Sequence, residues 1–190
     1  MTTGAVNPRR ADTRHNHERI LAAALESLTT SGELSFNAIA KRAEVGVGTV
    51  YRHFSTPEGL ILAVYRREVE HIVDVVPTLL EANTPEQAFR LWTVHLARYM
   101  MTKRGLADAL RTATTSQEEL FAKAYESMVG AVSTLIEANV RAGSVRAGVE
   151  PRTVLRALSG LLQLSPSEDW QNQTENLTDL LWKGMHAGQG

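Results

Sequence analysis

Apolar residues recur three or four positions apart along most of the chain, and short polar stretches with glycine, serine, threonine or proline separate these runs. This spacing is typical of α-helices that bury one face. The first run ends near Gly32 and consists of Ile20, Leu21, Ala24, Leu25 and Leu28. No segment shows the sustained alternation of a half-buried strand. The pattern therefore predicts an all-α fold of about nine helices.

Residues that cap or stop helices give the expected boundaries. Ser35 stands at an N-cap position, and Thr56 followed by Pro57 opens a fourth helix that should end near Val75, before Pro77. Residues 1–15 are polar and lack periodicity, which predicts a flexible arm. We expect the helices at roughly 20–31, 36–43, 48–54, 57–75, 85–104, 106–113, 117–142, 151–164 and 167–186.

The stretch AEVGVGTVYRHFSTPEGL, residues 43–60, contains two glycines followed by basic and aromatic residues. A dinucleotide-binding loop is excluded, because it needs a strand before its glycines and a third glycine after them, where this chain has Tyr51. Two short helices joined by a tight turn remain, which is a helix-turn-helix. Ala40 is small enough for a close crossing, and Val45 and Val50 would fill the junction.

The outer face of the second of these short helices carries side chains suited to a major groove. It consists of Val47, Gly48, Thr49, Tyr51, Arg52 and His53. Tyr51, Arg52 and His53 can bond phosphate oxygens, and Thr49 offers a methyl group and a hydroxyl to the bases. The alternative interpretation is that the aromatic residues only decorate or pack a small helical subdomain.

The amino-acid composition excludes several classes of protein but does not by itself indicate a function. The formal net charge of −1 lacks the excess of lysine and arginine usual for a nucleic-acid binder, and the absence of cysteine excludes disulfides and thiolate metal sites. The chain has no signal peptide and no apolar run long enough for a bilayer, which predicts a cytoplasmic protein without membrane association. His15 with His17, and Glu68 with His71, are too few for a metal site. No catalytic or cofactor motif is present, so no enzyme and no cofactor are expected.

The segment from His17 to Val64 closely resembles the DNA-binding region of tetracycline-repressor (TetR) family regulators, in the Ile-Leu-x-Ala-Ala start, Ile39-Ala40 and Val45-x-x-Gly-Thr-Val-Tyr-x-His-Phe. The resemblance implies a homodimeric, nine-helix repressor. It makes Thr49, Tyr51 and His53 DNA contacts and places Ser35 on a backbone phosphate. The domains implied are an arm at 1–15, a DNA-binding domain at 16–64 and a ligand-binding and dimerisation domain at 65–190.

Two positions depart from the family pattern. Glu44 lies in the turn where many relatives have glycine, so a left-handed conformation there would be mildly strained. Pro57 replaces a lysine or arginine that many relatives use, which removes one expected phosphate contact. Arg9, Arg10 and Arg14 in the arm would compensate by reaching the minor groove.

The second half of the chain has two aromatic-rich helical faces that could line a pocket for an apolar or aromatic molecule. The candidate ligand-binding residues are Trp92, His95, Tyr99, Phe121, Tyr125 and Met128. The alternative is that these faces only form packed core.

The last two long helices carry more apolar surface than one flank of a small bundle requires, which predicts a dimer interface built as a four-helix bundle. Its candidate residues are Val154, Leu158, Leu161, Leu162, Leu177, Leu181 and Met185. The alternative is that these residues only close the core of the single chain.

The combined interpretation is a ligand-responsive repressor that binds a palindromic double-stranded DNA operator as a homodimer and is released by an unidentified small-molecule effector. Two alternatives stay open. The first is a constitutive dimeric DNA binder without an effector, and the second is an all-helical protein that binds small molecules but no DNA.

Overall fold

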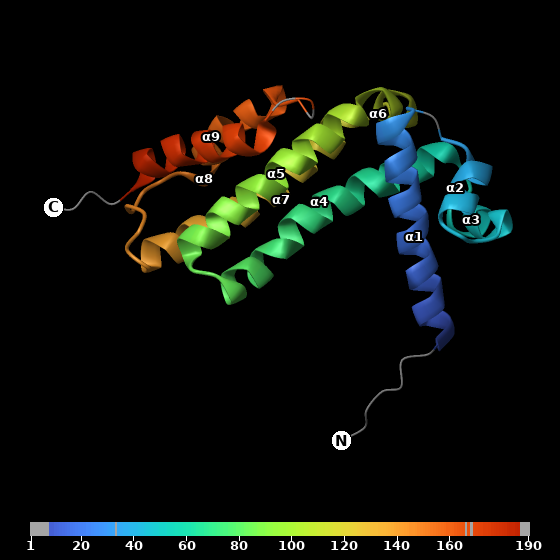
Figure 1. The fold of residues 1–190 in the computed structure, drawn as a ribbon, viewed down its shortest axis with the longest axis horizontal. Coiled ribbons are helices and arrows are strands. Elements are labelled where there is room, and N and C mark those ends of the chain that lie inside the picture. Colours follow the sequence, from blue (N-terminus) through green and yellow to red (C-terminus); the bar gives the residue numbers. More distant parts are fainter. Residues whose placement is uncertain (1–7, 33, 166, 168, 187–190) are drawn as a thin grey trace, which may run out of the picture. The chain divides into compact units, whose positions relative to one another are not determined.

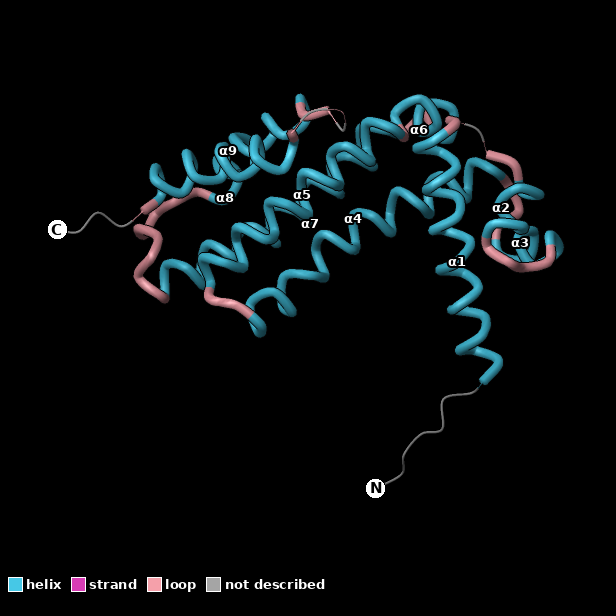
Figure 2. The backbone as a smooth tube through the Cα atoms, viewed as in Figure 1, coloured by secondary structure: helices cyan, strands magenta, loops and turns pink. Residues whose placement is uncertain are grey.

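The computed structural model describes residues 8–32, 34–165, 167 and 169–186. These residues form nine α-helices, one 3-10 helix (η1) and no strand (Figures 1 and 2), which confirms the all-α prediction. The elements are α1 (Pro8–Thr30), α2 (Phe36–Arg42), α3 (Val47–His53), α4 (Pro57–Ala82), α5 (Pro85–Gly105), α6 (Ala107–Ala113), α7 (Gln117–Arg141), α8 (Pro151–Leu158), η1 (Ser159–Gln163) and α9 (Trp170–Met185).

The chain divides into two compact units. The first, called the head, comprises the described residues up to Arg67 together with Gly105–Thr115. The second, called the body, comprises Glu68–Arg104 and the described residues from Ser116 on. Helix α4 runs through the boundary without interruption. The segment 105–115 joins the head although it was assigned to the second domain, and the backbone at Gly105 lies against Thr29 of α1.

Several predicted helix caps are present. The Ser35 hydroxyl accepts a hydrogen bond from the Ala38 amide at 3.5 Å, and the Thr56 hydroxyl accepts one from Gly59 at 3.1 Å. Each bond satisfies a backbone donor that the first turn of a helix leaves without a partner. Gly143 follows α7 with φ of +75°, a conformation that favours glycine.

Two predicted boundaries are wrong. Helix α1 begins at Pro8, so residues 8–15 of the expected arm are helical, whereas residues 1–7 lie outside the described residues. Proline suits the first position of a helix, because its missing backbone donor would have no partner there. Helix α4 continues through Pro77 to Ala82. Pro77 is exposed, and the buried Val76 and Leu79 on either side hold the helix in place despite the lost hydrogen bond.

The last two helices are shorter than expected. Helix α8 ends at Leu158 and continues as the 3-10 helix to Gln163. Helix α9 begins at Trp170 rather than near residue 167, because the Asp169 carboxylate caps it by accepting from the Asn172 amide at 3.4 Å.

The core of the head lies where α1, α2, α3 and the start of α4 meet. Its fully buried members include Ile20, Ala24, Ile39, Val50 and Leu60. Two polar bonds hold these helices together at the rim. The Arg42 guanidinium donates to the Ser27 hydroxyl at 2.6 Å, and Arg67 donates to Glu18 at 2.8 Å. The orientation of α2 and α3 is therefore set by packing against α1.

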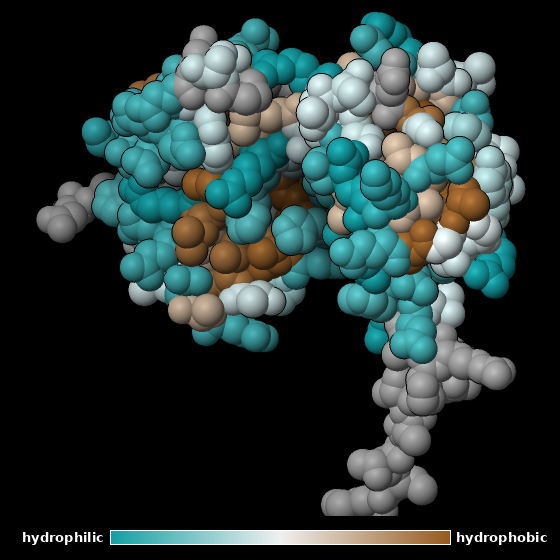
Figure 3. Space-filling view, turned by 45° about the vertical axis from the view of Figure 1, so that its right-hand side comes forward, coloured by the Kyte–Doolittle hydropathy of each residue, from teal (hydrophilic) through white to brown (hydrophobic). Residues whose placement is uncertain are grey.

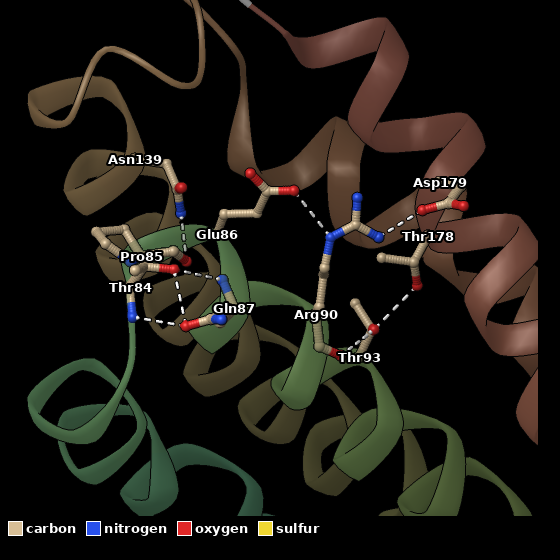
Figure 4. A network of polar contacts seen from close by, with 9 residues as sticks. All are labelled: Thr84, Pro85, Glu86, Gln87, Arg90, Thr93, Asn139, Thr178 and Asp179. Atoms are coloured by element: carbon tan, nitrogen blue, oxygen red, sulfur yellow. Dashed lines mark hydrogen bonds and ion pairs between the residues drawn. The ribbon is translucent and has the colours of Figure 1, made fainter.

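In the body, α5 is joined to α7 and α9 by polar contacts as well as by apolar packing (Figure 4). Arg90 pairs with Glu86 at 3.0 Å and with Asp179 of α9. The hydroxyls of Thr93 and Thr178, both almost fully buried, lie 2.9 Å apart. The Asn139 amide of α7 donates to the Pro85 carbonyl at 2.9 Å. These bonds fix α9 and α7 against α5.

Candidate nucleic-acid interface

The turn between α2 and α3 spans residues 43–46. Its backbone is closed by a hydrogen bond from the Val45 amide to the Ala40 carbonyl at 2.9 Å. Glu44 adopts φ of +51°, which confirms the expected left-handed conformation at this position. Such a conformation is strained for a residue with a side chain. The Glu44 carboxylate pairs with Arg19 of α1 at 2.5 Å, which offsets part of that strain.

Helix α3 has one fully buried residue, and most of its other residues are exposed. Val50 is fully buried against the head core, as predicted. Tyr51 is 58% exposed and Val47 is 40% exposed, although both are large apolar or aromatic residues. Gly48 and Arg52 are exposed, and Thr49 and His53 are half-buried. The six predicted residues thus share the outer side of one short helix.

The side chains on this surface are held by their neighbours. The Tyr51 ring packs edge-on against Phe36 of α2, with ring centroids 4.9 Å apart. The Arg52 guanidinium donates to the Thr49 hydroxyl at 2.8 Å. Ser35 is exposed and caps α2. Contacts of this kind reduce the rotamer freedom that a side chain must lose on binding.

His53 belongs to a small aromatic cluster with α1. Its ring centroid lies 5.4 Å from that of His17, and the His17 ring stacks on Phe54 at 5.1 Å. The pKa of His53 is lowered by burial and, to a smaller extent, by His17 and Arg52. The sequence suggested His17 only as half of a weak metal motif. Its contact with His53 follows from tertiary packing, which no local spacing reveals.

The lowered pKa of His53 predicts a pH-dependent stability. The unfolded chain takes up a proton near the ordinary histidine pKa of about 6.5, whereas the folded protein resists protonation at His53. The free energy of unfolding should therefore fall as the pH drops from about 6.5 through the lower folded pKa. Urea denaturation midpoints at several pH values should show a shallower dependence in a His53→Gln variant. Identical pH profiles for the two proteins would contradict this assignment.

Gly48 lies on the same surface with open space around it. A Cβ atom added there would meet nothing within 4 Å, and its φ is not in the left-handed region. Glycine inside a helix costs about 0.5–1 kcal/mol relative to alanine. The fold of the head therefore gives no reason for glycine at this position.

The predicted ligand residues occupy two kinds of environment in the body. Trp92, Tyr99 and Met128 are buried, and the Trp92 indole donates to the Ile72 carbonyl at 2.9 Å. His95 packs edge-on against His71 at 5.8 Å. Phe121 and Tyr125 are half-buried on α7. The assignment of these six residues to a ligand site stays a prediction.

The described residues of the body line surface cavities that include three with volumes of about 270, 370 and 440 Å³. The first lies between α5 and α9, the second between α8 and α9, and the third between α7 and the start of α8. None of the six predicted ligand residues lines these three cavities.

The predicted dimer residues are largely covered within the single chain. Val154, Leu158, Leu161 and Met185 are buried, and Leu177 and Leu181 are half-buried. The side chain of Leu162 lies outside the described residues. Leu180, next to Leu181, is 68% exposed. The interface stays a prediction, and its accessible apolar surface lies on α9.

Within the described ranges, no three histidine, aspartate or glutamate side chains gather in a way that could hold a metal ion. In the same part of the chain, no helix has both the length and the apolar content needed to cross a bilayer.

Two family models match the chain. Residues 20–64 match the model for bacterial regulatory proteins of the tetR family, and residues 84–187 match the C-terminal domain of SbtR-like transcriptional regulators. The chain is also 32% identical over 103 residues to the HTH-type transcriptional repressor KstR of Mycolicibacterium smegmatis. That match covers 53% of this chain and spans 50% of the length of the repressor.

Solved structures of similar fold cover nearly the whole chain. The TetR transcriptional regulator SCO0520 from Streptomyces coelicolor is 35% identical, with a TM-score of 0.81 over 90% of this chain and 98% of the other. A TetR transcription regulatory protein from Mycobacterium vanbaalenii is 31% identical, with a TM-score of 0.78 over 95% and 100%. The sequence of the present chain, the two family models that match it and its fold all indicate the same family. The chain belongs to the TetR family of transcriptional regulators.

Proposed function

We propose that this protein is a homodimeric repressor that binds a palindromic DNA operator and is released by a small, largely apolar molecule. The observation that carries the proposal is the outer surface of α3, where Tyr51 is 58% exposed while Val50 behind it is fully buried. A monomeric domain gains little from an exposed aromatic ring, whereas a DNA-binding helix presents such side chains to a major groove.

The chemistry of this surface suits phosphates and base edges. The Tyr51 hydroxyl and the His53 ring can bond phosphate oxygens, and Arg52 can bond either a phosphate or a guanine edge. Lys41 and Arg52 are exposed cations of the head, which provides positive charge near α3 despite the net charge of −1. Charge of this local kind steers DNA to one face of a nearly neutral protein.

The body supports dimerisation through α8 and α9. The groove between these helices has a volume of about 370 Å³ and is lined in part by Val154, Leu180 and Leu181. Separately from this groove, Figure 3 shows apolar side chains gathered among polar ones on one face of the body. Contiguous apolar surface of this kind marks an interaction site. Two heads related by a two-fold axis would then read half-sites about 34–36 Å apart, or a multiple of that distance.

Helix α4 is the element through which an effector would act. It is one continuous helix from Pro57 to Ala82 that begins in the head and ends in the body. A ligand bound in the body shifts the DNA affinity only if it binds two conformations with different affinity, typically by about 1–3 kcal/mol. A cross-link that fixes α4 should therefore abolish induction.

Selection of bound fragments from random DNA tests the proposal as a whole. We expect the selected fragments to share a palindrome whose half-site spacing fits a symmetric pair of heads. Analytical ultracentrifugation should show two protein chains or a multiple of two on each fragment. Fragments without common sequence, or a single chain on each, would contradict the proposed function.

A Gly48→Ala substitution gives a sharper local test. Because the added methyl meets nothing in the head, it should stabilise the protein by about 0.5–1 kcal/mol. If Gly48 lies against DNA, the same methyl should weaken binding to the selected fragment several-fold. Gly130→Ala, which also places a methyl in open space but on α7, is the matched control and should leave DNA binding unchanged. Unchanged DNA affinity in Gly48→Ala would remove this residue from the interface.

A further inference from the structure

Lys103, near the end of α5, lies in an unusual environment for a lysine. Its side chain is half-buried, and its Nζ atom lies 4.1 Å from the centroid of the Phe121 ring on α7. No ion pair of the described residues includes it. The residues three and four positions away on either side are Tyr99, Met100, Leu106 and Ala107, none of which is acidic. Burial lowers the pKa of the Lys103 ammonium.

Tyr125 lies one helical turn beyond Phe121, and residues four apart share a face of α7. Its hydroxyl oxygen is buried and has no hydrogen-bond partner in the described part of the chain. A buried polar group without a partner costs about 1–3 kcal/mol. A phenylalanine at this position would avoid that cost.

In the absence of a ligand, the Lys103 ammonium and the Tyr125 hydroxyl both destabilise the folded protein. An ammonium removed from water without a counter-ion is destabilising, and a cation–π contact with phenylalanine returns only about 0.5–2 kcal/mol. Lys103 and Tyr125 thus provide two hydrogen-bond donors beside one aromatic ring, and neither has a protein acceptor among the residues that the structure describes. A bound anion would supply that acceptor.

We propose that Lys103, Phe121 and Tyr125 form a recognition site for the carboxylate of an apolar effector. The carboxylate accepts hydrogen bonds from the Lys103 ammonium and the Tyr125 hydroxyl, and the apolar part of the molecule packs against the Phe121 ring. This inference deepens the proposed function, on which its role as an effector site depends. The spacing of aromatic residues predicts Phe121 and Tyr125 in a ligand site but not Lys103, because the closeness of Lys103 to the Phe121 ring is a tertiary contact.

The charge of the site favours a monoanion. Arg152 is a cation whose charge interacts with Tyr125, but its guanidinium is paired with both carboxylate oxygens of Glu126, at 2.6 and 2.7 Å. Lys103 then supplies one positive charge to the site, which matches one carboxylate. A phosphate monoester carries up to two negative charges and is usually held by several cations or by a bidentate arginine.

Isothermal titration calorimetry on the full chain without DNA tests the site. The probes are 2-naphthoate and decanoate, each compared with its neutral primary amide. We expect both carboxylates to bind at least 10-fold more tightly than their amides. Lys103→Met should lose that preference, and Tyr125→Phe should weaken carboxylate binding by a smaller factor. Lys123→Met removes an exposed lysine of α7 that pairs with Glu119, and should change nothing.

A stability measurement keeps the test valid if a variant were to fold poorly. Without a ligand, Lys103→Met should melt at the same temperature as the parent or higher, because it removes a half-buried charge without a counter-ion. A carboxylate that binds no better than its amide, or a Lys103→Met variant that keeps the preference, would overturn the inference.

The test is independent of the proposed function. Failure to bind DNA would leave the calorimetric result unaffected. Carboxylate binding that leaves the DNA complex intact would support the site and contradict its role in release.

Discussion

Replacement of Tyr51 and His53 together by alanine is expected to weaken binding to the selected operator by at least about 100-fold. Each residue can donate a hydrogen bond to a phosphate, and hydrogen bonds to charged groups contribute about 1.5–3 kcal/mol each. A loss of about 1.4 kcal/mol corresponds to a factor of ten in affinity. Fluorescence anisotropy with a labelled operator duplex, at one fixed salt concentration, would measure the change.

The fold should tolerate this double substitution. Tyr51 is mostly exposed and His53 is half-buried. The main structural cost of the double substitution is therefore the loss of two ring contacts, that of Tyr51 with Phe36 and that of His53 with His17. Tyr51→Phe keeps the ring on Phe36 and removes only the hydroxyl, which separates phosphate bonding from packing. Operator affinity equal to that of the parent in a folded double variant would disprove the assignment of α3 as the DNA-reading helix.

Trp92→Ala is expected to lower the free energy of unfolding by about 3–5 kcal/mol. Trp92 is fully buried in the body, and its indole bonds the Ile72 carbonyl of α4. The substitution leaves a cavity and deprives that carbonyl of its side-chain donor. A total stability of about 5–15 kcal/mol is usual for a domain, so the variant should lose much of it.

Urea denaturation monitored by circular dichroism would measure this loss. Leu91→Ala is the matched control, because Leu91 is the neighbouring residue on α5 but is 43% exposed. Its effect should stay within about 0.5 kcal/mol. A loss below about 1 kcal/mol for Trp92→Ala would show that the site collapses around the missing ring, contrary to rigid core packing.

Features with a local cause could be predicted from the sequence. Ser35, Thr56 and Gly143 begin or end helices because of bonds and dihedral angles within a few residues of each. The left-handed Glu44 follows from its place in a turn where many relatives have glycine. The burial of Val50 and the exposure of Tyr51 follow from the period of a short helix. The same period gives the other residues on the surface of α3, whose role as DNA contacts stays a prediction.

Features that depend on tertiary contacts were missed. The helix continues past Pro77 because buried neighbours outweigh one lost hydrogen bond. The segment 105–115 joins the head through contacts such as that of Gly105 with Thr29, which its composition does not reveal. The pairing of Lys103 with Phe121 joins residues on two helices, so neither helix alone predicts it.

The apolar stripes of α8 and α9 illustrate a further limit. Periodicity identifies a face that avoids water, but it does not say whether that face meets the same chain or a second one. Leu158 and Met185 are buried by their own chain, whereas Leu180, which the candidate interface omitted, is exposed.

The division of the chain also has a consequence for its synthesis. All segments of the head have emerged from the ribosome soon after Thr115 has been synthesised. The body is complete only when α9 has been added, because Thr178 and Trp182 of α9 are buried in the interior of the body. Translation proceeds at about 5–20 residues per second, and domains fold as units. The head can therefore mature several seconds before the body, and a nonsense mutation within α9 would yield an intact DNA reader on an incomplete body.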